Sequence, residues 1–381
     1  MSETQKHTKP NVPNLRFPGF EGEWARCTLG EIGEPYIGLT YSPADVVNEG
    51  GTIVFRSSNI QDGEIDYSDI VRVNKKIKYS IITRKDDLLI CARNGSPRLI
   101  GKNALLKEAD AGQTFGAFML VFRSMDNHFV HQLLSTKGYY SQVSENLGAR
   151  INQITTSNIK DFEFYFPPST AERNKIAQFL DLIDERISIQ NKVIEKYESL
   201  IKAITRCLVH CNGHQCFLGD IAEIYQPKTI TGLEMSNGGQ YPVFGANGII
   251  GHYKDYNHAS PQICIACRGN TCGVLNYTLP FSWITGNSMV INVDSSASGV
   301  NKRFLFHLLS TVDYSPLISG SGQPQIVRGP LRKLRITLPD KQCQDKNAQI
   351  IDCLIEKSNV EKALLRKLQT QKNYFLTAVF I

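Results

Sequence analysis

The 381-residue sequence lacks long hydrophobic runs. No stretch approaches the ~18 apolar residues of a membrane-spanning helix, and residues 1–18 contain no apolar signal-peptide core. We therefore expect a cytoplasmic protein with no membrane contact. Its ten cysteines are then expected to be reduced thiols and not a disulfide framework.

A strong excess of charge of one sign is also missing. The net charge is +6, and residues 25–168 hold 16 Lys and Arg against 16 Asp and Glu. Residues 213–338 hold 9 against 6. Neither region is a strongly basic domain, so any affinity for nucleic acid must come from local placement of side chains or from a partner subunit.

Catalytic and metal-binding signatures are absent as well. The sequence has no dinucleotide fingerprint, no Gly-x-Ser-x-Gly elbow and no His-Glu-x-x-His, and the Pro-Pro pair at 167–168 lacks the flanking residues of an amino-methyltransferase motif. Cys264, Cys267 and Cys272 suggest zinc, but the first two lie in an apolar run, with no second ligand pair at finger spacing. We expect no catalytic residue, metal site or cofactor in this chain.

What the sequence does contain is an internal duplication. TLGEIGE at 28–34 recurs as FLGDIAE at 217–223, LLICAR at 88–93 recurs as ICIACR at 263–268, and LLST at 133–136 recurs unchanged at 308–311. AQFLD at 177–181 then recurs as AQIID at 348–352. The order is preserved at a spacing of 171 to 189 residues, which is too long for a solenoid repeat and indicates two similar domains.

The pattern predicts an α+β protein in which each domain is followed by a long helix. Short β-like runs between Gly, Asn and Ser clusters fill each module, with one helix expected near residues 128–143 of the first. The expected segments are a leader at 1–24, a first module at 25–168, a helix at 169–212, a second module at 213–338 and a second helix at 339–381.

The first long helix carries a coiled-coil pattern. Ser169 and Glu172 fit a capping box at its start. Apolar residues then alternate four and three apart, interrupted once by Gln190, which is the spacing of a coiled-coil seam. The predicted seam consists of Ile176, Leu180, Ile183, Ile187, Ile194, Tyr197, Ile201, Ile204 and Leu208.

The second helix has a weaker seam, formed by Ile351, Leu354, Leu365, Leu368 and Phe375 and interrupted at Ser358, Glu361 and Lys372. Two long helices from equivalent places can pair antiparallel and form a rigid spacer between the modules. The alternative is that each helix packs on its own domain, but the regular seam favours the pair.

Loops at equivalent places in both modules are rich in groups that recognise nucleic acids. Arg can bridge guanine O6 and N7, Asn or Gln can bridge adenine N6 and N7, and basic residues near Arg328 can bind phosphates. Any one of these loops could be a simple turn, but their recurrence favours binding. The candidate DNA-binding residues are Arg56, Ser58, Asn59, Arg93, Asn94, Arg150, Asn152, Gln153, Asn247, Arg268, Asn270, Gln323, Gln325 and Arg328.

Taken together, these features resemble the specificity (S) subunits of type I restriction-modification enzymes. The resemblance rests on LRFPGFEGEW at 15–24, ICARNGS at 90–96, YPVFGANGIIGHY at 241–253 and the stretch at 150–184. It implies two target-recognition domains that each read half of a split site in double-stranded DNA. It also implies paired helices that set the length of the gap between the two halves of the site. Because the two modules differ outside the shared motifs, we expect an asymmetric site.

The resemblance further implies that the chain is a non-catalytic subunit. Two methyltransferase (M) subunits would use S-adenosylmethionine to methylate adenine, and restriction (R) subunits would add ATP- and Mg-dependent cleavage. Two alternatives remain open from the residues alone. The chain could be a protein-docking scaffold with degenerate readers, or a stand-alone DNA-cleaving enzyme.

Overall fold

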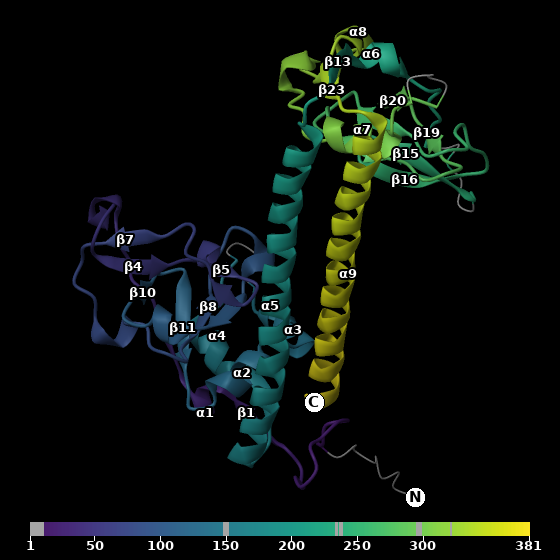
Figure 1. Cartoon of the computed structure of the whole chain (residues 1–381). Coiled ribbons are helices and arrows are strands. Elements are labelled where there is room, and N and C mark those ends of the chain that lie inside the picture. Colours follow the sequence, from purple (N-terminus) through teal and green to yellow (C-terminus); the bar gives the residue numbers. More distant parts are fainter. Residues whose placement is uncertain (1–10, 148–151, 233–234, 236–238, 295–298, 321) are drawn as a thin grey trace, which may run out of the picture. The chain divides into compact units, whose positions relative to one another are not determined.

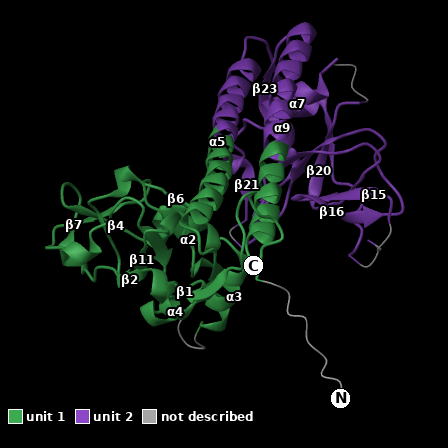
Figure 2. Cartoon of the chain, turned by 90° about the horizontal axis from the view of Figure 1, so that it is seen from below, with its two compact units in different colours: residues 1–192, 363–381 green, residues 193–362 purple. Residues whose placement is uncertain are grey.

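The computed structural model describes residues 11–147, 152–232, 235, 239–294, 299–320 and 322–381. The chain forms two compact units: residues 1–192 with 363–381, and residues 193–362 (Figure 2). The division falls within the two long helices, so each unit contains one domain together with a segment of both helices. Among the described residues, no helix has the length and apolar character needed to cross a bilayer.

Unit 1 contains two four-stranded sheets, with the orders β2-β11-β8-β9 and β10-β4-β7-β3. Two-stranded sheets β1-β12 and β5-β6 complete it. Its strands are β1 (Ala25–Thr28), β2 (Glu34–Ile37), β3 (Val46–Val47), β4 (Thr52–Phe55), β5 (Ile60–Gln61), β6 (Glu64–Ile65), β7 (Val71–Val73), β8 (Leu88–Cys91), β9 (Asn103–Leu105), β10 (Thr114–Phe115), β11 (Met119–Arg123) and β12 (Glu163–Phe166).

Unit 2 repeats this plan. The order β14-β20-β17-β18 matches β2-β11-β8-β9, and β19 pairs parallel to β15 as β10 does to β4. The sheet β13-β23 matches β1-β12, and β21 pairs with β22. The strands are β13 (His214–Phe217), β14 (Glu223–Tyr225), β15 (Tyr241–Gly245), β16 (Gly248–Tyr253), β17 (Ile263–Ala266), β18 (Leu275–Tyr277), β19 (Trp283–Ile284), β20 (Ser288–Asn292), β21 (Ile318–Ser319), β22 (Gln325–Ile326) and β23 (Arg335–Leu338).

Strands β8 and β17 explain why each domain folds around its repeated motif. All four residues of both strands are buried. Because successive side chains of a strand face opposite ways, Leu88 and Ile90 pack into one core, and Leu89 and Cys91 into another. In unit 2, Ile263 and Ile265 likewise lie in a different cluster from Cys264. The repeated apolar motif is therefore the central strand of each domain.

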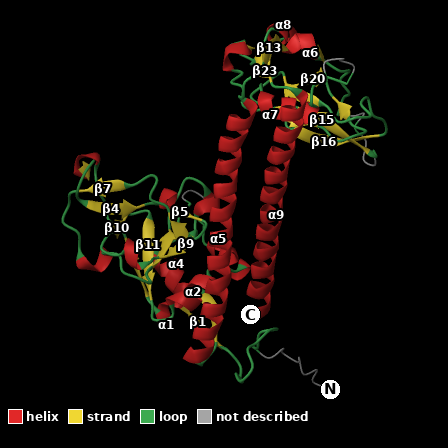
Figure 3. Ribbon diagram, in the orientation of Figure 1, coloured by secondary structure: helices red, strands yellow, loops and turns green. Residues whose placement is uncertain are grey.

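Helices pack on one face of each central sheet, because helical Phe129 shares a core with Leu88 and Ile90, and helical Phe304 with Ile263 and Ile265. The helices are red in Figure 3. The helix predicted at 128–143 is two helices, because Thr136 interrupts it and caps the second by accepting from the Tyr139 N–H. The α-helices are α1 (Leu29–Ile32), α2 (Asn127–Leu133), α3 (Lys137–Glu145), α4 (Thr156–Asp161), α5 (Thr170–Val209), α6 (Leu218–Ile221), α7 (Lys302–Leu309), α8 (Arg328–Arg332) and α9 (Lys341–Val379).

The two long helices, α5 and α9, follow their domains as expected (Figure 1). Ser169 caps α5 by accepting the Glu172 N–H at 3.3 Å. The reciprocal half of the predicted capping box is wrong, because the Glu172 carboxylate pairs with the Arg16 guanidinium at 2.7 Å. Asp340 caps α9 by accepting the Cys343 N–H at 2.8 Å.

Within each unit, α5 and α9 pack antiparallel. In unit 1, the Phe179 and Phe375 rings lie 4.9 Å apart, and Lys372 pairs with Asp184. In unit 2, Lys362 pairs with Glu198, and the Asn347 amide donates to the Leu208 carbonyl. All fourteen predicted seam residues are buried or half-buried, and the interrupting Ser358 is buried among them.

Candidate nucleic-acid interface

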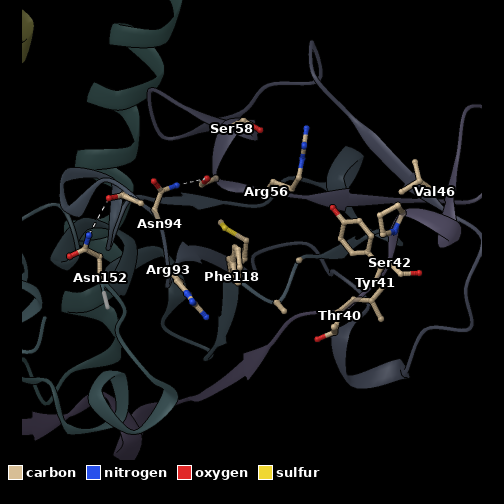
Figure 4. Close-up of a pocket in the computed structure, with 17 residues that line it drawn as sticks. Thr40, Tyr41, Ser42, Val46, Arg56, Ser58, Arg93, Asn94, Phe118 and Asn152 are labelled. Atoms are coloured by element: carbon tan, nitrogen blue, oxygen red, sulfur yellow. Dashed lines mark hydrogen bonds between the residues drawn. The ribbon is translucent and has the colours of Figure 1, made fainter. Parts of the chain in front are cut away.

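A cavity of about 1050 Å³ opens among the loops of unit 1. Arg56 and Ser58 follow β4, Arg93 and Asn94 follow β8, and Asn152 comes from the segment before α4 (Figure 4). Tyr41 and Phe118 contribute aromatic surface to the same lining. Five predicted DNA-binding residues, far apart in the sequence, thus meet at one concave surface.

Hydrogen bonds hold these loops together. The Asn94 amide donates to the Ser57 hydroxyl at 2.9 Å, and the Asn152 amide donates to the Gly95 carbonyl at 3.1 Å (Figure 4). The Ile154 N–H donates to the Ala92 carbonyl at 2.9 Å, and the Asn94 N–H donates to the Asn152 carbonyl at 3.3 Å. These backbone bonds form a loop junction, by which we mean the pairing of residues 92–94 with 152–154.

Arg93 is the cation of this surface that is most available to a ligand. Its guanidinium lies 4.9 Å from the centre of the Phe118 ring, and Phe118 is 57% exposed. Among the residues that the structure describes, Arg93 makes no ion pair, whereas Arg56 pairs with Asp69 at 2.7 Å. An aromatic face orients the guanidinium without neutralising it, so Arg93 keeps its donors for an anionic or base-edge partner.

Asn59 requires a correction. Its side chain is 1% exposed, and its amide donates to the Asp66 and Asp69 carbonyls at 3.0 and 2.8 Å. Its side-chain oxygen also accepts the Arg56 N–H. A buried amide with these partners cannot reach a base edge, so Asn59 organises the loop that carries Arg56. Gln153 is half-buried, and its backbone bridges to Arg93.

Unit 2 contains the same loop junction. Arg268 bridges antiparallel to Gln325, as Arg93 does to Gln153. The Ile326 N–H donates to the Cys267 carbonyl at 3.1 Å, and the Gly269 N–H donates to the Pro324 carbonyl at 3.0 Å. The backbone geometry around the two central arginines is therefore repeated, and both side chains are exposed.

The remaining candidates of unit 2 lie around this junction or apart from it. Three of them are exposed next to the two segments of the junction: Asn270, Gln323 and Arg328. Arg328 is the first residue of α8. Asn247 is exposed in the turn between β15 and β16, which the Asn276 amide holds through the Ala246 carbonyl at 3.2 Å. Arg150 lies outside the described residues.

Two cysteines of unit 2, Cys264 and Cys267, are core residues. Cys264 and Cys267 are buried in different hydrophobic clusters, so their sulfurs cannot share one metal ion. Burial raises the pKa of the Cys264 thiol to about 12, and burial also raises the pKa of Cys267. Protonated thiols in apolar surroundings are poor metal ligands and poor nucleophiles.

One group of residues in unit 1 has ligand-type atoms close together. His131, Asp181 and Asp184 bring ring nitrogen and carboxylate oxygens within 4.8 Å of one another. The carboxylates already have partners, because Gln132 donates to both and Lys372 pairs with Asp184. This group resembles a hydrogen-bonded network more than a metal site.

The aromatic part of the cavity was not predicted from the sequence. Tyr41 and Phe118 come from segments that match no repeated motif, so the duplication gave no reason to select them. The signal that could have indicated Phe118 is its apolar side chain next to Gly116 and Ala117, directly before a buried strand. Aromatic side chains dominate the energetics of interfaces, so an exposed Phe can indicate a contact surface.

The chain is similar to known proteins over both of its repeats. Residues 21–199 and 215–370 each match the family described as "Type I restriction modification DNA specificity domain". The EcoprrI specificity subunit of Escherichia coli is 30% identical over 112 residues, 29% of this chain and 27% of that protein. The StySPI specificity subunit of Salmonella potsdam is 24% identical over 194 residues, 49% of this chain and 42% of that protein. The matched stretches thus span less than half of these relatives.

Solved structures show the same fold. The type I restriction-modification S subunit from M. genitalium superposes with a TM-score of 0.68 at 19% identity, covering 97% of this chain and 99% of that one. A chain from a study of type I complex assembly gives a TM-score of 0.55 at 15% identity, covering 95% and 98%. With both repeats matched by the family over most of their length, this chain belongs to the type I restriction-modification DNA specificity family.

Proposed function

We propose that this chain is the DNA-reading specificity subunit of a type I restriction-modification complex, and that each domain reads one half of a split, asymmetric site. The observation that carries the proposal is the loop junction that recurs in both domains and presents an exposed arginine in each. Arg93 and Arg268 are suited to bidentate recognition of guanine. The flanking positions differ, because Gly269 and Pro324 stand in the second junction where Asn94 and Asn152 stand in the first.

The partners follow from this role. Two methyltransferase subunits would supply S-adenosylmethionine-dependent adenine methylation, and restriction subunits would supply ATP- and Mg-dependent cleavage. The family to which the chain belongs is generally non-catalytic. The chain itself would bind double-stranded DNA and its protein partners without a cofactor.

The direct test is modification mapping. The full chain is co-expressed with its cognate methyltransferase subunit in a host that lacks such systems, and the genome is sequenced with a read-out for N6-methyladenine. We expect a split motif with a fixed gap, methylated on both strands. A stable co-purified complex that methylates no new motif would overturn the proposal and favour a scaffold, while cleavage by the purified chain with magnesium alone would favour a nuclease.

The paired helices are proposed to set the gap. A matched pair of heptads, one in α5 between Ile187 and Ile194 and one in α9 between Lys362 and Lys372, would preserve the 3.5-residue spacing. The insertion adds ~10 Å of helix, which corresponds to about three base pairs. We expect the mapped gap to lengthen while both half-sites stay the same. An unchanged gap in a folded complex would refute the spacer role.

A further inference from the structure

Asp181 joins the first domain to its long helix. It lies on α5 and accepts hydrogen bonds from two residues one turn apart on α2: the His128 ring at 2.7 Å and the Gln132 amide at 2.7 Å. Each partner uses a different carboxylate oxygen. All three residues belong to unit 1.

Asp352 makes the same connection in unit 2. It lies on α9 and accepts from the Arg303 guanidinium, at 2.9 Å for Nε, and from the His307 ring at 2.7 Å. Arg303 and His307 are again one turn apart, on α7. The side chains of Asp181 and Asp352 are 31% and 29% exposed, so the two sites match in burial as well as in geometry.

The repeated motifs show that these residues are equivalent. Asp181 and Asp352 end the recurring AQFLD and AQIID segments, and the donor pairs precede LLST at the same distance in both repeats. The acceptor is therefore the same residue type in both copies, while the donor at each equivalent position differs. The geometry is kept even though His and Gln in one repeat stand where Arg and His stand in the other.

A second contact accompanies each aspartate, eight residues earlier on the long helix. Arg173 of α5 donates to Asp126, the N-cap of α2, at 2.9 Å. In unit 2, the side-chain oxygen of Gln344 on α9 accepts the N–H of Asn301, the N-cap of α7, at 2.9 Å. Two contacts separated by about 12 Å of helix restrict both sliding and rotation of the domain on the helix.

Hydrogen bonds matter here because apolar packing alone does not fix one position of the domain along its long helix. The apolar surfaces that α2 and α5 bury lower the free energy without specifying one register. Charge-assisted hydrogen bonds to two oxygens of one carboxylate are short and directional. A shift of the small helix by even one residue would break both.

We propose that Asp181 and Asp352 are positioning residues that lock each recognition domain at one place on its helix and thereby set where its reading loops meet DNA. This inference rests on the proposed DNA-reading function. Neither aspartate touches DNA in the proposal, so each should act on the accepted gap and not on the bases read.

The test uses the full chain in its complex with methyltransferase subunits, with Asp181→Asn and Asp352→Asn made separately. Asparagine keeps the size of the side chain, but it replaces one of the two acceptor oxygens with a donating NH2 group and carries no charge, so the pair of charge-assisted bonds is lost. Binding is measured to DNA carrying the mapped half-sites at the native gap and at gaps one base pair shorter and longer. We expect each variant to lose about tenfold in its preference for the native gap, close to the effect of one lost charge-assisted bond.

Two control variants separate positioning from folding. Glu185→Gln removes an exposed acid one turn beyond Asp181 and should leave gap preference unchanged. The double change His128→Arg with Gln132→His gives the first domain the donors of the second. With Asp181 intact, this variant should retain the wild-type gap preference. Combined with Asp181→Asn, it should not restore that preference.

The outcomes are distinct. If the aspartate variants assemble, keep their half-site bases and discriminate between gaps as the wild type does, the positioning role is refuted. Loss of base preference together with a lower unfolding temperature would mean that the aspartates only hold the fold, which also refutes it. A wild-type complex that recognises no split site would refute the proposed function itself.

Discussion

The reading loops of the two domains share their backbone and differ in their side chains. Arg93 with Gln153 and Arg268 with Gln325 are bridged in the same way. Around Arg93, however, the structure places Phe118, Asn94 and Asn152 in one cavity. Around Arg268 lie a glycine with φ of 80° at 269 and the exposed Asn270.

This difference shows how one fold can acquire two DNA specificities. The loop junction consists of backbone hydrogen bonds, which do not depend on the side chains that flank them. Substitutions beside the arginines can therefore change the base that is read without altering where the loops lie. The DNA site is expected to be asymmetric because the backbone bonds that hold the loops are separate from the side chains that read the bases.

Removing each arginine in turn should have the largest effect. Arg93→Ala should weaken binding through the first half-site by about ten- to a hundredfold, because a bidentate base contact contributes ~1–3 kcal/mol. Arg268→Ala should do the same for the second half-site alone. Binding is measured with oligonucleotides altered in one half at a time. Arg98→Ala, an exposed cation of the same loop outside the cavity lining, is the matched control, and equal loss at both halves would contradict separate readers.

A second experiment tests the division between supporting and reading residues within the first domain. Asn59→Ala removes a buried amide that donates to the Asp66 and Asp69 carbonyls and accepts the Arg56 N–H, so we expect a loss of ~1–3 kcal/mol in the free energy of unfolding. Ser58→Ala, at the neighbouring exposed position, should not change stability. Thermal unfolding of both variants measures the difference. A stable Asn59→Ala protein with altered base preference would restore the original reading role of Asn59.

The smallest expected effect is a difference in pH response between the domains. Asp181, with Asp86, raises the pKa of His128 above its ordinary 6.5. The stabilisation is complete below pH ~6.5 and is lost as pH rises through the folded-state pKa. Arg303 occupies the equivalent position in unit 2 and stays charged. Because His128 is half-exposed, we expect a change below about 1 kcal/mol.

The variant His128→Arg should abolish that loss of stability above pH ~6.5, as followed by the unfolding temperature between neutral and mildly alkaline pH. His131 does not interfere in this range, because burial lowers its pKa to about 4. Its charging costs stability only as pH falls from ~6.5 toward that value. An unaltered pH profile in His128→Arg would show that the His128–Asp181 bond contributes nothing to stability.

Much of the fold was predictable because duplication and periodicity act at the level of whole elements. The recurrence of the motifs predicted two similar domains, and the alternation of apolar residues predicted α5. The 128–143 helix was mispredicted because a single Thr at 136 caps a new helix within an apolar pattern. A Thr side chain that bonds to a nearby backbone N–H can end one helix and start another, and the spacing of apolar residues does not indicate such a bond.

The site was less predictable, for a physical reason. Composition marked Asn59 as a base reader, but burial depends on tertiary contacts with residues such as Asp66 and Asp69. The aspartates at 181 and 352 stood at the end of a recognised repeat, yet their donors lie some 50 residues away. The sequence displays both partners of such a contact but not their proximity.

The division of the chain has a consequence for how the protein is made. Unit 2 is continuous, whereas the core of unit 1 includes Leu376, Val379 and Phe380. During translation the first domain is therefore synthesised before the residues that complete its core, and it must wait for all of unit 2 to leave the ribosome. Unit 1 is therefore the unit whose core is completed last, although most of it is encoded first.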